Sequence, residues 1–190
     1  MKRRIAVVAL VFVAFALIAQ QALAQNPHLK GRNPVVFTDL GLTLRARVSY
    51  AGLGNFDTLQ NLAARAQPTA DCVNPGSGEH RPPGHNPAEA EVSGSTAVPR
   101  GDIKNGNVTI TTTTNAPVTP IPGAPDCPNP NWIENITDLA FTSATITLFQ
   151  DSNENGTFED GELVLTVNCT FNPPTSNGAV PSSGFTCTVA

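Results

Sequence analysis

The sequence is poor in several residue types, and each shortage argues against a class of protein. Its 190 residues include one Met, one Trp and one Tyr, and only 14% are charged. Helix-forming Lys, Met and Gln are scarce, whereas Thr, Val, Pro, Gly and Asn are abundant. This composition is typical of an all-β protein with long loops. Beyond residue 24 no apolar run is long enough to span a bilayer, so we expect no membrane anchor in the mature chain.

Basic residues are also few once the N-terminal segment is set aside. Residues 1–24 carry a basic stretch at 2–4, an apolar core at 5–19 and a small-x-small cleavage site ending at Ala24. This pattern predicts a secretory signal peptide that is cleaved after Ala24, and hence a secreted, extracellular protein. The remaining chain has eight Lys and Arg against 15 Asp and Glu, so we expect no nucleic-acid-binding surface.

No two cysteines have the Cys-x-x-Cys spacing of common zinc sites, which argues against a metal role for them. Cysteines of an exported chain are expected to be paired, and four of them allow three connectivities. The segment 163–171 and the last strand both alternate with period two. If they pair antiparallel with Phe171 opposite Phe185, Cys169 lies opposite Cys187, within bridging distance.

This pairing leaves Cys72 to bond with Cys127. Each of these two cysteines precedes a stretch rich in Pro and Asn, so the bridge would join two irregular loops. The expected role of all four cysteines is structural.

Alternation of apolar and polar residues predicts seven or eight short strands between long loops rich in Pro and Gly. Residues 57–67 are ambiguous between a short helix and a strand, and the all-β context favours a strand. We therefore predict a single immunoglobulin-like β-sandwich domain over residues 35–190, preceded by a flexible leader at 25–34. The segments expected to form strands are Val35–Phe37, Thr43–Tyr50, Ala90–Val98, Asn107–Asn115, Trp132–Ala140, Ala140–Gln150, Leu163–Phe171 and Gly184–Val189.

One loop between two predicted strands carries the pattern of a calcium site. Calcium takes six to eight oxygen ligands, so a single loop must turn sharply and revisit the ion. In the twelve residues 151–162, oxygen-bearing residues stand at positions one, three, five, seven, nine and twelve, and Gly156 at position six permits the turn. The predicted ligands of a structural Ca²⁺ ion are Asp151, Asn153, Asn155, Thr157 through its carbonyl, Glu159 and Glu162. The alternative is a polar hairpin tip in which Asn155-Gly156 forms the turn without a metal.

The flanking segments 140–150 and 163–171 alternate as strands do, and helices are not predicted on either side. In this respect the loop resembles the EF-hand-like calcium loops set between strands in repeat domains of bacterial surface adhesins. The resemblance covers the twelve loop residues and implies a structural ion rather than a helix-opening sensor.

Over most of its mature length the chain also resembles small uncharacterised secreted bacterial β-sandwich proteins. This resemblance implies an origin and a fold, and it implies no activity. It is carried by four segments: Ala51–Phe56, Pro82–Pro87, Asp102–Val108 and Asp126–Trp132.

Three functional classes remain, and an enzyme is the weakest of them because the nucleophile-elbow, zincin and Walker motifs are missing. His80 and His85 fall in one Pro- and Gly-rich stretch and are expected to be exposed loop residues. Trp132 is either a core residue or the aromatic platform of a carbohydrate-binding module. The preferred interpretation is a secreted, non-catalytic β-sandwich with a structural calcium loop, acting in extracellular or cell-surface interaction with a protein or glycan.

Overall fold

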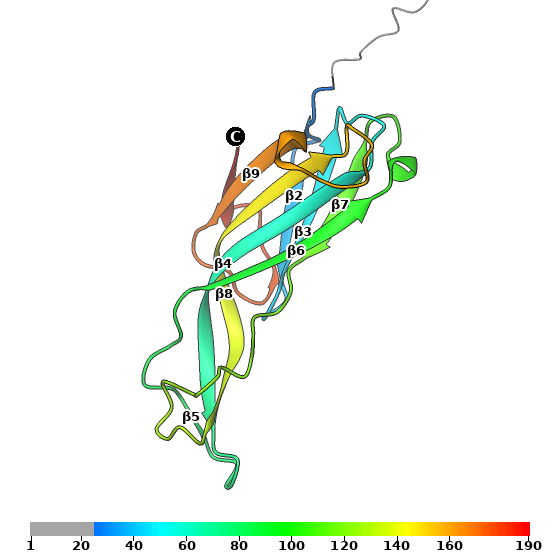
Figure 1. Ribbon diagram of the computed structural model, residues 1–190. Coiled ribbons are helices and arrows are strands. Elements are labelled where there is room, and N and C mark those ends of the chain that lie inside the picture. The colour runs from blue at the N-terminus through cyan, green and yellow to red at the C-terminus, as the bar shows by residue number, and fades with distance from the viewer. Residues whose placement is uncertain (1–24) are drawn as a thin grey trace, which may run out of the picture.

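The computed structural model describes residues 25–190, and the predicted signal peptide at 1–24 lies outside the described residues. The regular structure of this part is β, apart from two single 3₁₀ turns (Figure 1). The strands are β1 (His28–Leu29), β2 (Val35–Asp39), β3 (Leu44–Ala51), β4 (Thr58–Val73), β5 (His80–Arg81), β6 (Ala90–Val98), β7 (Val108–Thr113), β8 (Ile133–Gln150), β9 (Leu163–Phe171), β10 (Gly178–Ala179) and β11 (Phe185–Val189), and the turns are η1 (Arg100–Asp102) and η2 (Asp160–Glu162).

The strands form two antiparallel sheets that pack face to face as a β-sandwich. In the first sheet β10, β2 and β3 are neighbours, and β7 pairs with the other edge of β3, while β1 adds two residues at the end of β3. In the second sheet the order is β11, β9, β8 and β4, and both β6 and β5 pair with β4. The all-β class is thereby confirmed, whereas the immunoglobulin-like arrangement stays a prediction.

The core lies between the inner faces of the two sheets. The period-two alternation expected from the sequence is present in full on β3, where every second residue is buried. Phe37 of the first sheet packs edge-on against Phe171 and Phe185 of the second, with ring centroids 5.0 and 5.1 Å apart. The fully buried apolar side chains that fill the rest of this layer include Leu44, Val48, Leu62, Leu139, Phe141 and Leu148.

A polar network crosses the core and joins the two sheets. The hydroxyl of Tyr50 on β3 donates to Gln60 Oε1 on β4 at 2.7 Å, and Gln60 Nε2 donates to Thr112 Oγ1 on β7 at 2.8 Å. All three side chains are buried completely. Burial raises the pKa of Tyr50 far above its ordinary value, so its hydroxyl remains a donor. Buried polar groups that satisfy one another in this way fix the relative position of the sheets.

The two sheets are in direct hydrogen-bond contact around β6 and β7. Asn115 N–H donates to Ser93 O at 2.8 Å, and Thr96 Oγ1 donates to Thr111 O at 3.1 Å. A Cβ on Gly94 would stand 2.1 Å from Thr113 O, so only glycine allows the two backbones to approach at this point.

Beyond the sandwich body, β4 and β8 continue as a long ribbon (Figure 1). We call this extension, residues 67–89 and 116–138, the arm. Register shifts at Arg65/Ala66 and Thr69/Ala70 mark β-bulges where the ribbon leaves the body. The prediction of short strands is therefore wrong for β4 and β8, which have 16 and 18 residues.

Several strand predictions are confirmed, and three details are wrong. The strand preferred for residues 57–67 is confirmed over 58–67, which belong to β4. The two strands predicted at 132–140 and 140–150 are one continuous strand, β8. The leader at 25–34 contributes β1 to the first sheet, so the domain begins before residue 35. The alternation of 163–171 predicts Leu163 on the same face as the buried Leu165, but Leu163 is 44% exposed and lies beside a register shift at Leu148/Phe149.

Candidate functional site: the loop between β8 and β9

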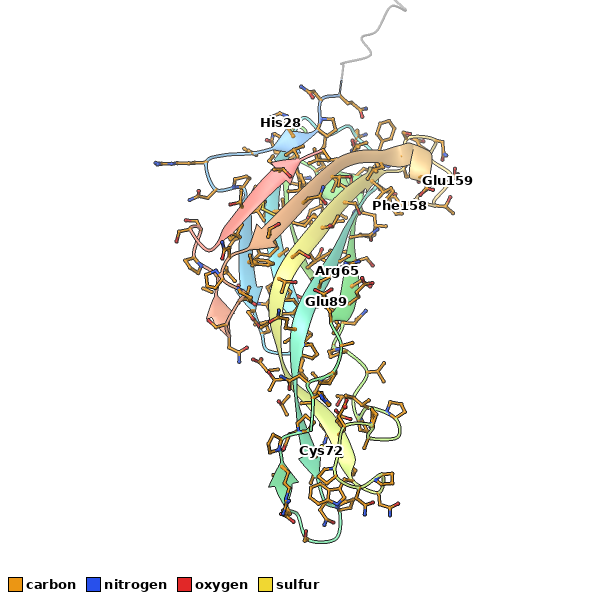
Figure 2. The ribbon with its side chains drawn as sticks, turned by 90° about the vertical axis from the view of Figure 1, so that its left-hand side faces the viewer. His28, Arg65, Cys72, Glu89, Phe158 and Glu159 are labelled. Atoms are coloured by element: carbon orange, nitrogen blue, oxygen red, sulfur yellow. A yellow bond between two sulfur atoms is a disulfide. The ribbon has the colours of Figure 1, made fainter. Side chains whose placement is uncertain are left out.

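The predicted calcium loop occupies the tip of the β8–β9 hairpin. Strand β8 ends at Gln150 and β9 begins at Leu163, so residues 151–162 are the whole connection. The loop lies at the opposite end of the molecule from the arm, as the positions of Phe158 and Cys72 show (Figure 2). Gly156 has φ +80° and Glu154 has φ +57°, which gives the chain the sharp reversal that a single loop needs to surround an ion.

The first predicted ligand, Asp151, is only 4% exposed and organises the first half of the loop. Its Oδ1 accepts the N–H of Asn155 at 3.0 Å, and its Oδ2 accepts the N–H of Gly156 at 2.9 Å. Asn153 Oδ1 accepts the same Asn155 N–H at 2.9 Å, and Asn155 Oδ1 accepts Thr157 N–H at 2.8 Å. These bonds turn the side chains at positions one, three and five toward the inside of the loop.

The last predicted ligand, Glu162, closes the loop from its other end. Its side chain is 6% exposed, and its Oε1 accepts from Asn153 N–H at 3.2 Å and from Ser152 Oγ at 3.3 Å. Its Oε2 accepts the N–H of Glu159 at 3.3 Å, within the single turn η2. Position twelve is therefore brought back to position three, as a twelve-residue calcium loop requires.

The loop concentrates negative charge, and of its five acidic side chains only Glu154 has an ion-pair partner among residues 25–190. Asp151, Glu159 and Glu162 form no ion pair with any Lys, Arg or His of residues 25–190. Buried carboxylates are expensive unless a cation or several donors compensate them.

The acid side chains alone do not make a metal centre. In the described part of the chain, no group of three or more His, Cys, Asp or Glu side chains is arranged to hold a metal ion. A calcium ion in this loop would therefore depend on the neutral oxygens of Asn153, Asn155 and the Thr157 carbonyl in addition to the carboxylates.

Two other turns pack beside the loop and make one acidic end of the molecule. Asp151 N–H donates to the carbonyl of Asp57 in the β3–β4 turn at 2.9 Å. The carboxylate of Asp57 accepts Arg100 N–H of the β6–β7 turn at 2.7 Å. Arg100 Nη1 reaches across to Glu154 Oε1 at 2.9 Å. We call these three turns, residues 51–57, 99–107 and 151–162, the acidic end.

Both predicted disulfides are present. Cys169 lies opposite Cys187 in the β9–β11 ladder, with Phe171 opposite Phe185 as expected, and the two Cα atoms are 4.1 Å apart. Cys72 is bonded to Cys127 across the arm, with Cα atoms 5.7 Å apart. Two disulfides fit an oxidising, extracellular environment.

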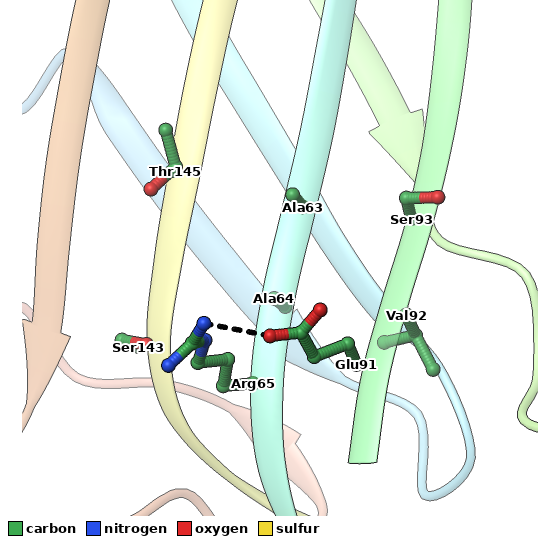
Figure 3. Close-up of a pocket in the computed structure, with 8 residues that line it drawn as sticks. All are labelled: Ala63, Ala64, Arg65, Glu91, Val92, Ser93, Ser143 and Thr145. Atoms are coloured by element: carbon green, nitrogen blue, oxygen red, sulfur yellow. Dashed lines mark ion pairs between the residues drawn. The ribbon is translucent and has the colours of Figure 1, made fainter.

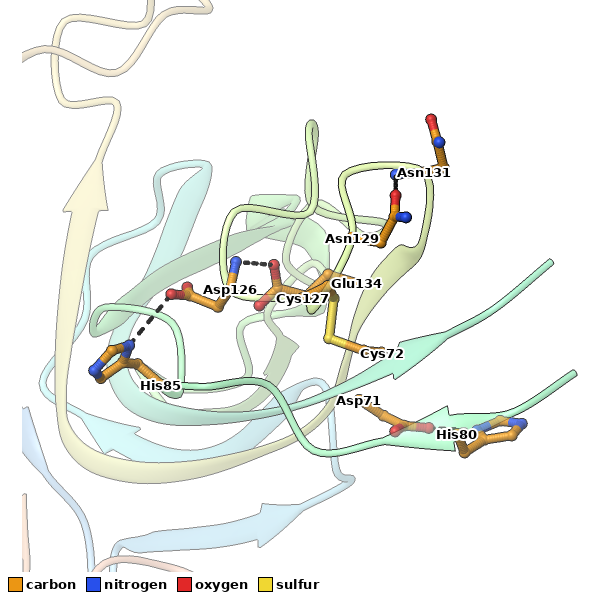
Figure 4. The surroundings of a disulfide bond; sticks show 9 residues. All are labelled: Asp71, Cys72, His80, His85, Asp126, Cys127, Asn129, Asn131 and Glu134. Atoms are coloured by element: carbon orange, nitrogen blue, oxygen red, sulfur yellow. Dashed lines mark hydrogen bonds and ion pairs between the residues drawn. A yellow bond between two sulfur atoms is a disulfide. The ribbon is translucent and has the colours of Figure 1, made fainter.

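Sequence reasoning missed the pairing of the arm histidines with the aspartates that precede the bridged cysteines (Figure 4). His80 Nδ1 lies 2.5 Å from Asp71 Oδ2, and His85 Nδ1 lies 3.6 Å from Asp126 Oδ1. Both imidazoles are largely exposed, as expected, although His80 belongs to β5 rather than to a loop. A third histidine, His28, lies in β1 with Nδ1 2.7 Å from the Asn26 carbonyl oxygen.

The arm also buries one carboxylate that the sequence did not single out. Glu134 is fully buried on β8 opposite Cys72, and its Oε2 lies 3.5 Å from Asp126 N–H. Its Oε1 has no hydrogen-bond partner within residues 25–190. The backbone of Glu134 also accepts Ile121 N–H at 2.7 Å, so this residue contacts the 119–127 loop through both its backbone and its side chain (Figure 4).

Trp132, the candidate carbohydrate platform, lies in the arm just before β8 and is half-buried, so it is not a core residue. The guanidinium carbon of Arg81 lies 6.0 Å from the ring centroid, in the range of a cation–π contact. One face of the ring is therefore occupied by the protein itself.

A hollow of about 490 Å³ lies on the outer face of the second sheet (Figure 3). Small side chains such as Ala63, Ser93 and Ser143 form it, and Arg65 Nη2 pairs with Glu91 Oε1 at 2.7 Å along one side. Its lining is exposed and its only charged groups compensate each other, so it offers no reactive constellation comparable with the loop.

Comparisons with known proteins add no relative: no family model, no curated protein and no solved structure matches the chain. Within residues 25–190 there is also no helix of the length and apolar character needed to cross a membrane.

Proposed function

We propose that the protein is a secreted, non-catalytic β-sandwich that binds a structural calcium ion in residues 151–162 and serves extracellular or cell-surface interaction. One observation supports the calcium site above all others. The carboxylates of Asp151 and Glu162 are buried at 4% and 6% exposure at the two ends of one loop, and no cationic side chain of the described residues compensates them. A divalent ion bound between them would supply the missing charge.

The hydrogen bonds within the loop leave room for the ion. A carboxylate oxygen has two lone pairs, and Asp151 uses each oxygen for one N–H bond. The amide oxygen of Asn153 likewise accepts one N–H, whereas that of Asn155 accepts both the N–H and the hydroxyl of Thr157. These bonds fix the direction of the oxygens. Lone pairs of Asp151 and Asn153 remain for a cation, and at Asn155 an ion would displace the Thr157 hydroxyl.

The charge of the ligand set predicts a weak site. Asn153 and Asn155 are neutral where tighter calcium loops use aspartate. We expect a dissociation constant of about 10⁻⁴ to 10⁻³ M, which is the range of extracellular calcium modules. Because the loop joins two strands and not two helices, binding would stiffen the β8–β9 hairpin rather than open a groove.

The glycan-binding alternative is the weaker proposal. Trp132 is half-buried and its ring is already in contact range of Arg81, so an exposed aromatic platform for a sugar ring is only partly available.

Thermal unfolding of the oxidised protein tests the calcium site. At 10 mM calcium, a dissociation constant of about 10⁻³ to 10⁻⁴ M gives roughly 1.4 to 2.7 kcal/mol of stabilisation. For a domain of this size the midpoint should rise by about 3 to 10 °C over the value in chelator. The double variant Asp151→Asn with Glu162→Gln should lose this rise.

Asp160→Asn is the matched control, because Asp160, at position ten of the loop, has an exposed side chain and is not a predicted ligand. It should keep the calcium response. No rise at 10 mM calcium, or an equal rise in the double variant, would reduce the loop to a polar hairpin tip.

A further inference from the structure

A small hollow of about 220 Å³ opens beside the proposed calcium loop. One wall is the end of β6 and the residue after it, which present the apolar side chains of Ala97, Val98 and Pro99. Another part of the lining belongs to the calcium loop itself, through Gly156 and Phe158. More than half of the lining residues are therefore apolar, and the volume is large enough for one long side chain.

Carboxylates border this hollow. Asp57 and Asp151 are both among its lining residues. Asp57 Oδ1 accepts Arg100 N–H, while its Oδ2 has no hydrogen-bond partner among the described residues. The hollow therefore combines an apolar passage with at least one carboxylate oxygen that is free to accept.

The surrounding acidic end remains negative even with calcium in place. It contains seven carboxylates, and its two basic side chains, Arg100 and Lys104, have partners of their own in Glu154 and the Gly101 carbonyl. The two charges of an ion do not cancel the remainder. The acidic residues of the three turns are Asp57, Asp102, Asp151, Glu154, Glu159, Asp160 and Glu162.

From this combination we propose that the hollow receives a lysine side chain of an extracellular protein partner. The methylene stem packs between Val98 and Phe158, and the ammonium group reaches the Asp57 carboxylate. The choice of a basic partner segment rests on charge complementarity with the acidic end, and the choice of a long aliphatic stem rests on the apolar walls. An acidic or uncharged segment lacks one of these two features.

This inference rests on the proposed calcium site, because Gly156 and Phe158 form one wall only while the loop holds its shape. The N–H of Gly156 is anchored to Asp151, a predicted ligand, so an ion at Asp151 fixes that wall. Binding of the partner segment should consequently depend on calcium.

The test is a titration of the ¹⁵N-labelled oxidised protein with short peptides, followed by NMR. The probe is acetyl-Gly-Ser-Lys-Ser-Gly-amide, and its two counterparts carry norleucine or glutamate in place of lysine. With calcium, the lysine peptide should shift the amides of Val98, Gly156 and Phe158. Its affinity should be at least tenfold higher than that of either counterpart, because norleucine keeps the stem without the charge and glutamate reverses the charge.

Variants locate the site. Phe158→Ala and Asp57→Asn should each weaken the lysine peptide about tenfold, and both spectra report whether the fold is kept. Glu91→Gln, a matched carboxylate change on the outer face of the second sheet, should leave binding unchanged. Equal binding of the norleucine peptide, or unchanged binding in both site variants, overturns the proposal.

The calcium and chelator arms separate the two proposals. If calcium raises the unfolding midpoint but the lysine peptide shifts no amide of the hollow, the docking proposal fails and the calcium site stands. If the peptide binds the hollow equally in chelator and calcium has no effect on the midpoint, the calcium site fails and its control over docking fails with it.

Discussion

For the buried network of Tyr50, Gln60 and Thr112, we predict a double variant that is less destabilised than one of its single variants. Gln60 is the centre of the network, because it accepts from Tyr50 and donates to Thr112. Gln60→Leu keeps a side chain of similar size but leaves two buried hydroxyls without their partner. Each such group costs about 1 to 3 kcal/mol, so the single variant should lose roughly 2 to 6 kcal/mol of stability.

Removing the hydroxyl of Tyr50 as well should restore part of that loss. In Tyr50→Phe with Gln60→Leu, only the Thr112 hydroxyl is left unpaired, so we expect the double variant to be about 1 to 3 kcal/mol more stable than Gln60→Leu alone. Adding Thr112→Val removes the last unpaired hydroxyl and should bring the stability near that of the wild type. Tyr50→Phe by itself should be destabilised, because it leaves Gln60 Oε1 unpaired.

Urea unfolding with both disulfides intact measures these differences, with circular dichroism as the probe and equal m-values as the check that the transition is comparable. The informative quantity is the interaction energy between Tyr50 and Gln60 in the double-mutant cycle. If the costs of the two single variants add within about 0.5 kcal/mol, the network does not act as a unit and the reasoning is wrong.

Two further predictions concern the backbone crossing and the acid range. Gly94→Ala should cost at least about 1 to 3 kcal/mol, because its Cβ would stand 2.1 Å from Thr113 O, while Gly101→Ala, with nothing within 4 Å of its Cβ, should be nearly neutral in the same thermal scan. Burial, together with the charge of Asp138, raises the pKa of Asp39 above its ordinary value of 3.8. Asp39 therefore binds its proton more tightly in the folded state than in the unfolded state. Its contribution to the free energy of unfolding is consequently lost as the pH rises through the folded-state pKa. Asp39→Asn should therefore remove the loss of unfolding free energy that Asp39 causes as the pH rises above about 4, and an unchanged slope would show that this carboxyl is not perturbed.

Much of the fold follows from local patterns in the sequence. Strand β9 has the predicted bounds 163–171, and the pairing of Cys169 with Cys187 follows from aligning Phe171 with Phe185. These features are predictable because a period-two pattern fixes which side chains share a face, and a shared face fixes the register. The bounds of the loop at 151–162 follow for the same reason, because β8 ends and β9 begins where the alternation stops.

The arm could not be predicted in the same way. Pro68 lies inside β4, opposite Leu139, although proline is a signal against a strand interior. The register shift at Arg65/Ala66 leaves Thr142 of β8 as an extra residue, so the alternation of β8 changes phase there, and no local sequence pattern predicts this change. Hence the 18-residue β8 looks like two strands in the sequence, and the role of Glu134 beneath the arm loop depends on contacts that only the folded chain makes.

The arm and the acidic end share one physical problem, and in the arm the Cys72–Cys127 disulfide addresses it. In the arm, the buried side chains near the bridge are small or polar, such as Ala70, Ala124 and Glu134, and the acidic loop at the other end buries two carboxylates, Asp151 and Glu162. Neither end removes enough apolar surface from water to offset the entropy of ordering its backbone. At the arm a disulfide closing 55 residues compensates, which in the chain-entropy model is worth about 4 kcal/mol. The calcium ion proposed for the acidic loop would provide an equivalent constraint, because it would neutralise the two buried carboxylates.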